Sequence, residues 1–400
     1  MEQRNNKRPT FDKIRKKFYK QVAENDKNEK KKLIISALVV LLLASILLFS
    51  ASLVETSGKG KYVYLYGNYE QSIRTDVCFV DGNQLIDMNA LANYCGFEKE
   101  DENTVSTFSI NNTYVTFENN SKIATINGIK KEMPTKAQIK NGYCLVPMST
   151  VSDIVFGIEI QHNDKSANVI KTAQNMYIID KDAKIEYLTD ISSYLEYINS
   201  SDEYVFTLLN KQNPIDEEFE PDDLVAIPSA FSRKDKTIYL QSTAMMALEA
   251  MFNDMVEDGI TDAYIQSSYR SHSYQAMLFN MYIEDEMANG LSREEAEIKA
   301  NKYSARPEYS EHRTGLAVDF TTKSIGGAVD DIFETTEAFT WLKANSWKYG
   351  FVLRYPEDKE STTGYMYESW HYRFVGLEVA SIMYQTGLCY EEYLAIFGAK

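Results

Sequence analysis

The sequence predicts an α+β protein with two folded units that follow a membrane-spanning helix, and three observations support this prediction. The chain has 400 residues, 44% hydrophobic and 25% charged, which is the balance of a globular protein long enough for two or three domains. A long uncharged stretch lies near the N-terminus. After it, segments with period-two alternation are mixed with segments whose apolar residues recur at helical spacing.

The N-terminal tail and the rest of the chain carry opposite charge. Residues 1–32 contain 12 Lys or Arg and 5 Asp or Glu, whereas the remaining 368 residues contain 30 and 53. We therefore describe residues 1–32 as a basic tail on an acidic body. An acidic body repels phosphate groups, so nucleic acid is not an expected partner.

The uncharged stretch "LIISALVVLLLASILLFSASLV" (residues 33–54) predicts a transmembrane helix. Its 22 residues would extend about 33 Å, and a bilayer core is about 30 Å thick. Lys30, Lys31 and Lys32 precede it, and basic flanks stay in the cytoplasm. We expect a single-pass protein of the cell membrane with extracytoplasmic C-terminal domains. A cleaved signal peptide, with "FSAS" (residues 49–52) as its cleavage site, fits less well because the basic and apolar regions are both too long.

The four cysteines give no metal-binding pattern. Cys78, Cys95, Cys144 and Cys389 include no CxxC pair, so a thiolate metal site is not expected. Three of them fall in one segment, which leaves two readings open for an exported protein. They form one disulfide there, or they are small buried hydrophobic residues.

The first folded unit is expected over residues 60–172 and contains a weak internal repeat. "IDMNALANYCGF" (86–97) is similar to "VPMSTVSDIVFGI" (146–158), and each predicts a short helix closed by glycine, with strands after it. This pattern resembles the N-terminal-domain-like module of copper amine oxidases, an extracytoplasmic appendage in Gram-positive bacteria. We do not infer copper chemistry, because His162 is the only histidine of the unit and is expected in a turn.

A connector is expected over residues 173–203, and the second folded unit over residues 204–390. "STAMMALEAMFNDMVEDG" predicts a helix whose methionine stripe lies in the core and which stops at Gly259. "DAYIQSSYR" predicts a strand, and "SYQAMLFNMYIEDEMANG" and "SREEAEIKANKYSA" predict two helices. Ser292 and Glu295 fit a capping box at the start of the second of these helices.

Two short motifs in the second unit carry the residues of a catalytic metal site. His312 and Asp319 lie in "SEHRTGLAVDF", and Glu368 and His371 lie in "YESWHYRF". Two histidines and one carboxylate are a complete protein ligand set for a catalytic zinc whose fourth position is left to water. Glu368 is then a spare carboxylate that can take a proton from that water.

The "GLAVDF" segment predicts a strand with two different faces. Alternation places Ala317 and Asp319 on one face, and the apolar Leu316, Val318 and Phe320 on the other. A turn at residues 313–315 would bring the first histidine and the aspartate together. We expect Gly315 and Ala317 to keep the backbone and side chains clear of the metal and the substrate.

An ordered set of motifs over residues 210–387 resembles the VanY-type D-alanyl-D-alanine carboxypeptidases, zinc peptidases of the bacterial cell wall. The segments are "LLNKQNPI", "SSYRSHSYQ", "SEHRTGLAVDF", "WLKANSWKYGFVLRYP" and "ESWHYRFVG". The resemblance implies the Hedgehog/DD-peptidase type of fold, with a central antiparallel sheet and helices packed on one side. It also implies zinc as the cofactor.

The resemblance assigns roles to individual residues. His312, Asp319 and His371 would be the zinc ligands, and Glu368 the general base. Arg270 would polarise the scissile carbonyl or hold developing negative charge.

Other positions concern the pocket. Gln275 and Ser310 match positions that line the pocket for the terminal residue of the substrate. Glu308 and Ser369 depart from the family pattern, where glycine and proline are common, and both changes would alter loop stiffness.

Three further residues near the motifs have competing interpretations. Trp370 is expected to pack beside the site rather than contact the substrate. His272 is expected in a loop, since the ligand set is already full. Arg354 has two equally supported roles, binding of a peptide carboxylate or a structural ion pair.

The resulting hypothesis is a membrane-anchored zinc carboxypeptidase that removes the terminal D-alanine from peptidoglycan stem peptides. One alternative is an LD-carboxypeptidase that acts on tetrapeptide stems. Another is an inactive wall-binding protein, and the complete set of ligands and base argues against it.

Overall fold

The computed structural model of the chain describes residues 72–398 apart from 77, 81, 163–165 and 203. The basic tail and the predicted transmembrane helix, residues 33–54, lie outside these described residues. None of the described helices combines the length and the apolar character that crossing a bilayer requires.

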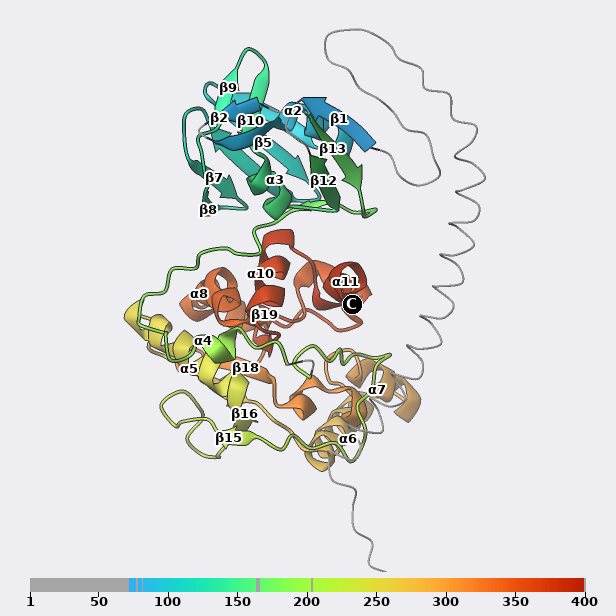
Figure 1. Cartoon of the computed structure of the whole chain (residues 1–400). Coiled ribbons are helices and arrows are strands. Elements are labelled where there is room, and N and C mark those ends of the chain that lie inside the picture. The colour runs from blue at the N-terminus through green and yellow to red at the C-terminus, as the bar shows by residue number, and fades with distance from the viewer. Residues whose placement is uncertain (1–71, 77, 81, 163–165, 203, 399–400) are drawn as a thin grey trace, which may run out of the picture. The chain divides into compact units, whose positions relative to one another are not determined.

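The first unit consists mainly of antiparallel strands (blue to green in Figure 1). One sheet has the order β1-β13-β12, a second β2-β3-β10-β9, and a third runs β4 to β8 in sequence order; β11 pairs with β14. Since β14 belongs to this pair, the strand pairing extends past residue 172, where we expected the unit to end. The strands are β1 (Ser72–Asp76), β2 (Cys78–Val80), β3 (Asn83–Asp87), β4 (Glu98–Glu102), β5 (Val105–Ile110), β6 (Thr113–Glu118), β7 (Ile123–Ile126), β8 (Ile129–Glu132), β9 (Gln138–Lys140), β10 (Tyr143–Pro147), β11 (Val155–Phe156), β12 (Ile158–His162), β13 (Ser166–Lys171) and β14 (Tyr177–Ile178).

The internal repeat is a strand followed by a short helix. Strand β3 leads into α2 (Met88–Cys95), and β10 leads into α3 (Met148–Ile154). Helix α2 ends at Gly96, which has a left-handed φ of 82°, as predicted. Helix α3 differs from the prediction, because it passes directly into the extended strand β11 and is not closed by a glycine. His162 is the last residue of β12 rather than a turn residue.

The cysteines are unpaired. Cys95 and Cys144 are buried in the core of the first unit, and Cys389 is buried in the second. Burial raises the pKa of the Cys144 thiol to about 12 and that of Cys95 to about 11. Of the two readings that the sequence left open, the structure has the one without a disulfide.

The connector contains the short helix α4 (Leu195–Ile198) and is fixed to the second unit by one buried carboxylate. Asp254 of α5 (Ser242–Glu257) accepts hydrogen bonds from the backbone nitrogens of Leu188, at 2.9 Å, and Thr189, at 2.8 Å. Buried carboxylates are stable in a protein interior only with such donors, so this contact fixes the path of the connector.

The second unit is built on a four-stranded antiparallel sheet with the order β17-β18-β20-β19, accompanied by the separate pair β15 and β16. Its strands are β15 (Leu224–Ala226), β16 (Tyr239–Gln241), β17 (Ala263–Ser267), β18 (Ala317–Thr322), β19 (Phe351–Leu353) and β20 (His371–Phe374). Its further α-helices are α6 (His272–Ala288), α7 (Arg293–Ala300), α8 (Glu337–Asn345), α9 (Glu360–Thr363), α10 (Leu377–Thr386) and α11 (Tyr390–Phe397). Its 3-10 helices are η1 (Pro307–Tyr309), η2 (Glu311–Thr314), η3 (Asp331–Thr335), η4 (Ser346–Tyr349) and η5 (Glu357–Lys359).

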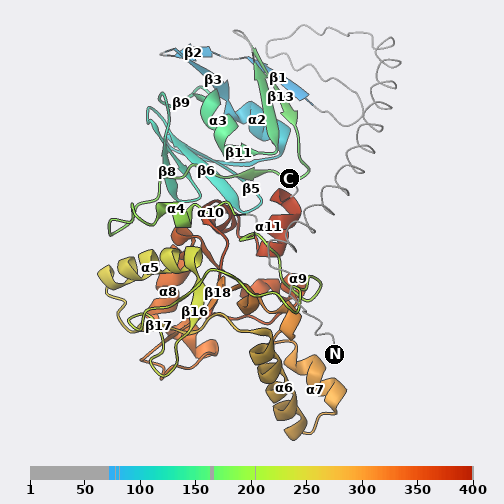
Figure 2. The same cartoon turned by 60° about the horizontal axis from the view of Figure 1, so that its bottom comes forward.

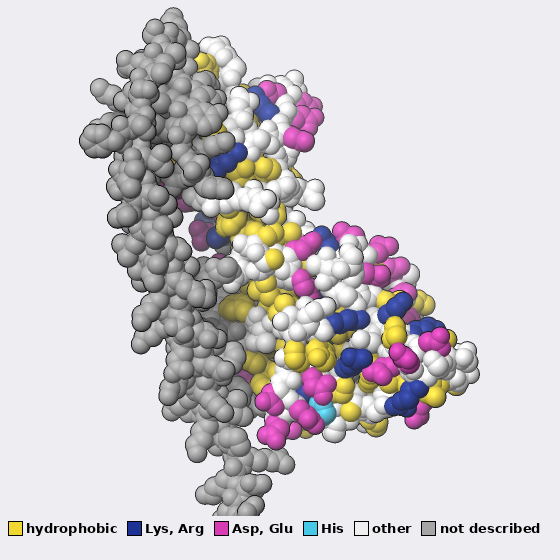
Figure 3. Space-filling view, turned by 90° about the vertical axis from the view of Figure 1, so that its right-hand side faces the viewer, with side chains coloured by type: hydrophobic (Ala, Val, Ile, Leu, Met, Phe, Trp, Pro, Cys, Tyr) yellow, Lys and Arg dark blue, Asp and Glu magenta, His cyan; other side chains and the backbone are white. Residues whose placement is uncertain are grey.

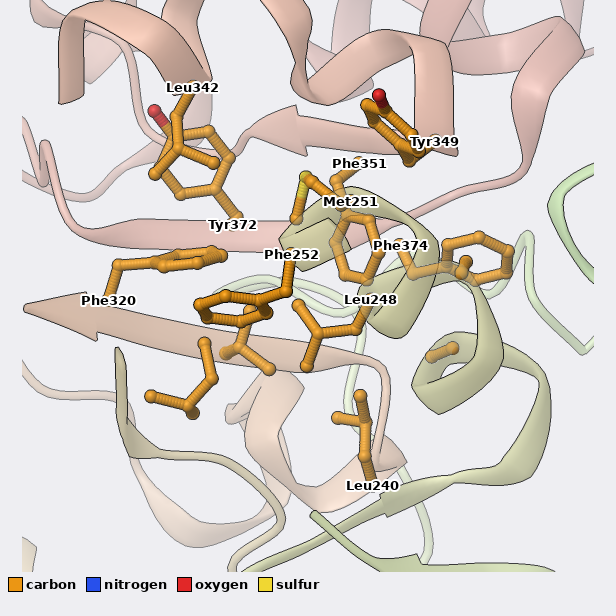
Figure 4. Packing of buried hydrophobic residues seen from close by; sticks show 14 of the residues in the cluster. Leu240, Leu248, Met251, Phe252, Phe320, Leu342, Tyr349, Phe351, Tyr372 and Phe374 are labelled. Atoms are coloured by element: carbon orange, nitrogen blue, oxygen red, sulfur yellow. The ribbon is translucent and has the colours of Figure 1, made fainter. Parts of the chain in front are cut away.

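One face of this sheet packs on α5 and forms the core of the unit (Figure 4). Phe320 of β18 lies against Phe252 of α5, with ring centroids 5.9 Å apart. Met251 and Met255 are fully buried, which confirms that the methionine stripe belongs to the core. Burying one large apolar side chain contributes about 1.5–3 kcal/mol, so this face holds the sheet in place. The opposite face is left for polar side chains.

Helices α6 and α7 form a hairpin and lie side by side in Figure 2. The hydroxyl of Ser271 accepts a hydrogen bond from the Tyr274 backbone nitrogen and caps α6. His272 is therefore the first residue of a helix, and the prediction of a loop residue was wrong. The predicted capping box between Ser292 and Glu295 is present at α7.

Charged side chains of both signs are spread over the described part of the face in Figure 3. Acidic side chains (magenta) predominate on the lower part of this view, with basic ones (dark blue) between them. A phosphate backbone placed on that surface would meet carboxylates, which disfavours its binding. The absence of a nucleic-acid partner stays a prediction.

Candidate active site

The polar face of the sheet brings two predicted ligands together. In the antiparallel pairing of β18 with β20, Asp319 lies directly opposite His371. Directly opposite residues project from the same face of a sheet, so their side chains are neighbours. The distance between Asp319 Oδ1 and His371 Nδ1 is 2.9 Å.

The third predicted ligand, His312, reaches the sheet from η2. Its Nε2 lies 3.2 Å from Asp319 Oδ2. Gly315 follows η2 with a left-handed φ of 68°, and a Cβ there would lie 2.9 Å from Leu224 Cδ2. Glycine is therefore required for the backbone turn and for packing against β15. We had expected it to provide clearance around the metal, and that expectation was wrong.

These three side chains form a site of the right composition for zinc. One potential ligand atom from each lies within 4.8 Å of the others, and all three residues are buried. His312 Nδ1 donates to the backbone oxygen of Ser268 at 2.7 Å, which fixes the ring and leaves Nε2 available. Two imidazole nitrogens and one carboxylate oxygen match a catalytic zinc site with an open position.

The two histidines differ in their affinity for protons. Burial lowers the pKa of His312 to about 4, with the Arg270 guanidinium acting in the same direction. Burial also disfavours the charged form of His371, but the carboxylates of Asp319 and Glu311 outweigh it and raise its pKa to about 9. Neutral imidazole binds metal, so a metal ion and a proton compete for His371.

Glu368 lies beside the three predicted ligands and is not one of them. Its Oε2 lies 3.8 Å from His371 Nδ1. Burial raises the pKa of Glu368 to about 7; the charges of His371 and Arg270 oppose this shift, and Asp319 and Glu311 support it. A carboxylate with a pKa near neutral is suited to accept and return a proton.

Arg270 donates to the predicted ligand Asp319, with Nη2 at 2.6 Å from Oδ2. Its Nε donates to Ser267 Oγ at 2.9 Å, and its Nη1 to Gln275 Oε1 at 3.2 Å. The amide nitrogen of Gln275 donates in turn to the backbone oxygen of Ala305, at 2.9 Å. Gln275 therefore holds Arg270 in place, a role that the sequence did not indicate.

All seven site residues predicted from the sequence line one cavity of ≈ 420 Å³. This volume lies within the range of about 300–1,000 Å³ that is usual for small-ligand sites. The lining includes Ser310, which is 3% exposed, and Trp370, which also packs against the core. The predicted site residues are His312, Asp319, His371, Glu368, Arg270, Gln275 and Ser310, and the aromatic wall residues include Tyr274, Tyr282, Tyr303, Tyr355 and Tyr365.

Glu308, one of the two departures from the family pattern, makes a local contact. Its Oε1 lies 3.0 Å from Nε2 of His272. Its backbone oxygen accepts from the Ile215 nitrogen at 2.8 Å. These contacts tie the start of α6 and the loop at residue 215 to η1, and an effect of Glu308 on loop stiffness stays a prediction.

The sequence motifs did not predict a buried ion-pair network that lies next to the predicted ligands. Arg354 is fully buried, with Nε 2.8 Å from Glu311 Oε1 and Nη2 2.7 Å from Glu391 Oε1. The nitrogen Nη1 of Arg373 lies 3.1 Å from the same Glu311 oxygen. Of the two roles left open for Arg354, the structure has the ion pair. The only sequence signal for Glu311 was its position directly before a predicted ligand.

Comparisons with known proteins find two families in the chain. Residues 237–377 match the VanY family, described as D-alanyl-D-alanine carboxypeptidase. Residues 68–171 match the copper amine oxidase N-terminal domain. Both resemblances drawn from the sequence motifs are thereby confirmed.

Two curated relatives each match about half of the chain. The chain is 36% identical over 212 residues to the putative carboxypeptidase YodJ of Bacillus subtilis, covering 52% of this chain and 74% of that protein. It is 34% identical over 194 residues to a D-alanyl-D-alanine carboxypeptidase of Enterococcus faecalis, covering 48% of this chain and 66% of that protein. A solved structure of a vancomycin-resistance VanY D,D-pentapeptidase mutant with Zn(II) is 33% identical, with a TM-score of 0.41, covering 48% of this chain and 99% of that one.

Proposed function

Because the chain belongs to the VanY family of D-alanyl-D-alanine carboxypeptidases, we propose that it is a zinc carboxypeptidase acting on peptidoglycan stem peptides. Its substrate is the pentapeptide stem, and the bond that breaks is the last peptide bond. The products are free D-alanine and a stem shortened by one residue.

The observation that supports this proposal most strongly is the arrangement of four side chains in one cavity. His312, Asp319 and His371 present potential ligand atoms within 4.8 Å of one another. Glu368 lies next to them, 3.8 Å from His371, and is not needed as a ligand. Two nitrogens and one oxygen are the donor set of a catalytic zinc, and zinc is the cofactor that we assign here.

Each residue of the site has a separate task in the proposed reaction. When bound, zinc would polarise the scissile carbonyl and increase the acidity of a water molecule. Glu368 accepts the proton of the attacking water and returns it to the nitrogen of the departing D-alanine. Arg270 places its guanidinium beside Asp319 and stabilises negative charge that develops on the carbonyl oxygen.

The lining of the cavity supports a peptide substrate, and the sequence near the N-terminus supports an anchor. The tyrosines and the tryptophan of the wall offer apolar and hydrogen-bonding surface to the peptide. We place the catalytic unit outside the cell membrane, held by the segment at residues 33–54, because its 22 uncharged residues follow a basic tail. In the sequence, the repeat-containing module comes between this segment and the catalytic unit.

The test is cleavage of defined stem peptides by the full chain, analysed by mass spectrometry. We expect the pentapeptide to lose one D-alanine and the tetrapeptide to remain intact. Loss of D-alanine from the tetrapeptide instead would assign an LD-carboxypeptidase. A chain that binds no zinc and cleaves neither peptide would refute the enzymatic proposal and favour a wall-binding role.

A further inference from the structure

The predicted ligand His371 has one ring nitrogen on the metal side and one on the other side. Its Nδ1 faces Asp319 and Glu368, at 2.9 Å and 3.8 Å. Its Nε2 points away from them, to Oε2 of Glu311 at 3.7 Å. A metal bound between the three ligands would therefore take Nδ1, and the proton of the neutral ring would lie on Nε2.

The two facing atoms both lack a partner among the described residues. His371 Nε2 and Glu311 Oε2 are buried polar atoms that make no hydrogen bond. A buried polar atom without a hydrogen bond lowers the stability of the folded protein. A donor and an acceptor that face each other can avoid this loss by forming a hydrogen bond. Their separation of 3.7 Å is longer than the usual hydrogen-bond range of about 2.7–3.2 Å, so the His371 ring must move about 0.5 Å toward Glu311 to form this bond.

Glu311 is held rigidly enough to orient another group. Its other oxygen, Oε1, lies 2.8 Å from Arg354 Nε and 3.1 Å from Arg373 Nη1. Arg354 is fixed in turn by Glu391, through two contacts of 2.9 Å and 2.7 Å. The two arginines and two glutamates carry no net charge together, so the network is stable in the interior as long as it is complete.

We propose that Glu311 is a positioning residue that accepts a hydrogen bond from His371 Nε2 and thereby fixes this ring with Nδ1 toward the zinc. A carboxylate behind a metal-bound imidazole sets its tautomer and increases its basicity. His312 has the same kind of support from the Ser268 carbonyl, but through the other ring nitrogen. The two histidines therefore bind zinc through different nitrogens, Nε2 in His312 and Nδ1 in His371. This inference rests on the metal site of the proposed function.

The first test is the zinc affinity of Glu311→Gln in the full chain, measured by competition with a chromophoric chelator. The amide preserves the shape but removes the charge behind the ring, so we expect the dissociation constant to rise about 10–100-fold. The matched control is Glu391→Gln, which removes a carboxylate from the same arginine without touching His371. It should lower stability and leave the zinc affinity unchanged. Equal zinc affinities in both variants and the wild type would overturn the inference, as would equal losses in both.

The second test asks which ring nitrogen of each histidine binds zinc. It needs no variant at position 311, so it still applies if that variant fails to fold. The chain has four histidines, so nitrogen-15 NMR of the zinc-loaded wild type gives four ring systems. His162→Gln and His272→Gln identify the two rings outside the site. We expect one zinc-bound ring protonated at Nδ1 and the other at Nε2. Two zinc-bound rings protonated at the same nitrogen would overturn the inference. A wild type that binds no zinc would overturn the proposed function as well.

Discussion

Replacing Glu368 by glutamine removes the proposed general base while keeping the shape of the side chain. Loss of a general base lowers kcat about 10²- to 10⁴-fold, equivalent to about 2.7–5.4 kcal/mol in the activation free energy. We expect the upper part of this range, because the neighbouring carboxylates are already engaged. Asp319 contacts Arg270 and both histidines, and Glu311 contacts two arginines.

The assay measures D-alanine release from a pentapeptide together with the zinc content of the same sample. Zinc content should stay at the wild-type level, since Glu368 is not in the ligand set. Glu360→Gln is the matched control. Among the described residues, the only hydrogen bond of this exposed carboxylate of α9 is with the backbone nitrogen of Tyr367, at 3.0 Å, so the variant should keep the wild-type rate. A Glu368→Gln enzyme that is fully loaded with zinc and keeps more than about a tenth of the wild-type kcat would refute the reasoning, because that loss lies below the range for a general base.

Three further predictions follow from the pKa shifts and the buried charges. The kcat/KM of the wild type should fall as the pH is lowered through the pKa of Glu368, because the protonated acid cannot act as a base. This pKa is about 7 without metal, and the charge of zinc lowers it. A profile that is flat from pH 8 to pH 4 would contradict this assignment. Zinc binding near pH 7.5 should release about one proton, because the raised pKa of His371, about 9, keeps that ring protonated in the metal-free protein. Calorimetry in two buffers of different ionisation enthalpy measures the number of protons released. No release would show that the ring was already neutral. Arg354→Met should lower the free energy of unfolding by about 3–5 kcal/mol, because Glu391 loses its buried partner. Urea unfolding measures this loss. A loss under about 1 kcal/mol would contradict the prediction, because it is the value expected for a solvent-exposed ion pair.

The sequence was most informative where one local pattern determined one structural outcome. Alternation in residues 316–320 placed Val318 and Phe320 in the core and Asp319 on the polar face, as the structure has them. Helical spacing in residues 242–257 correctly placed Met251 and Met255 in the core. The two short motifs together provided the side chains that converge on one cavity. In each case, the relevant neighbours are close in sequence or belong to a recognisable motif.

The sequence was least informative where the partners of a side chain come from distant segments. The contacts of Arg354 with Glu311 and Glu391 depend on how η2, β19 and α11 are brought together, and no spacing in the chain indicates that. The role of Gln275 depends on Arg270 and on Ala305, which precedes η1. Gly315 was predicted to matter for the wrong reason, since its close neighbour Leu224 belongs to a strand far from it in sequence.

Local competition between structures explains two smaller errors. His272 lies in a polar, serine-rich stretch that is typical of a loop, but Ser271 caps the helix and makes His272 its first residue. Helix α3 was expected to continue to a glycine, yet β-branched and aromatic residues at its end pair with β14. In both cases a single capping or pairing interaction determined the secondary structure, against the preference suggested by the residue types of the segment.

The most direct test of the proposed function is the restoration of activity by zinc in the full chain. The protein is stripped of metal with a chelator, and D-alanine release from a defined pentapeptide is followed before and after addition of one equivalent of zinc. We predict no release before addition and full activity at one zinc per chain, held by His312, Asp319 and His371. Release that persists in the metal-free protein, or that one equivalent of zinc does not restore, would contradict the proposed function.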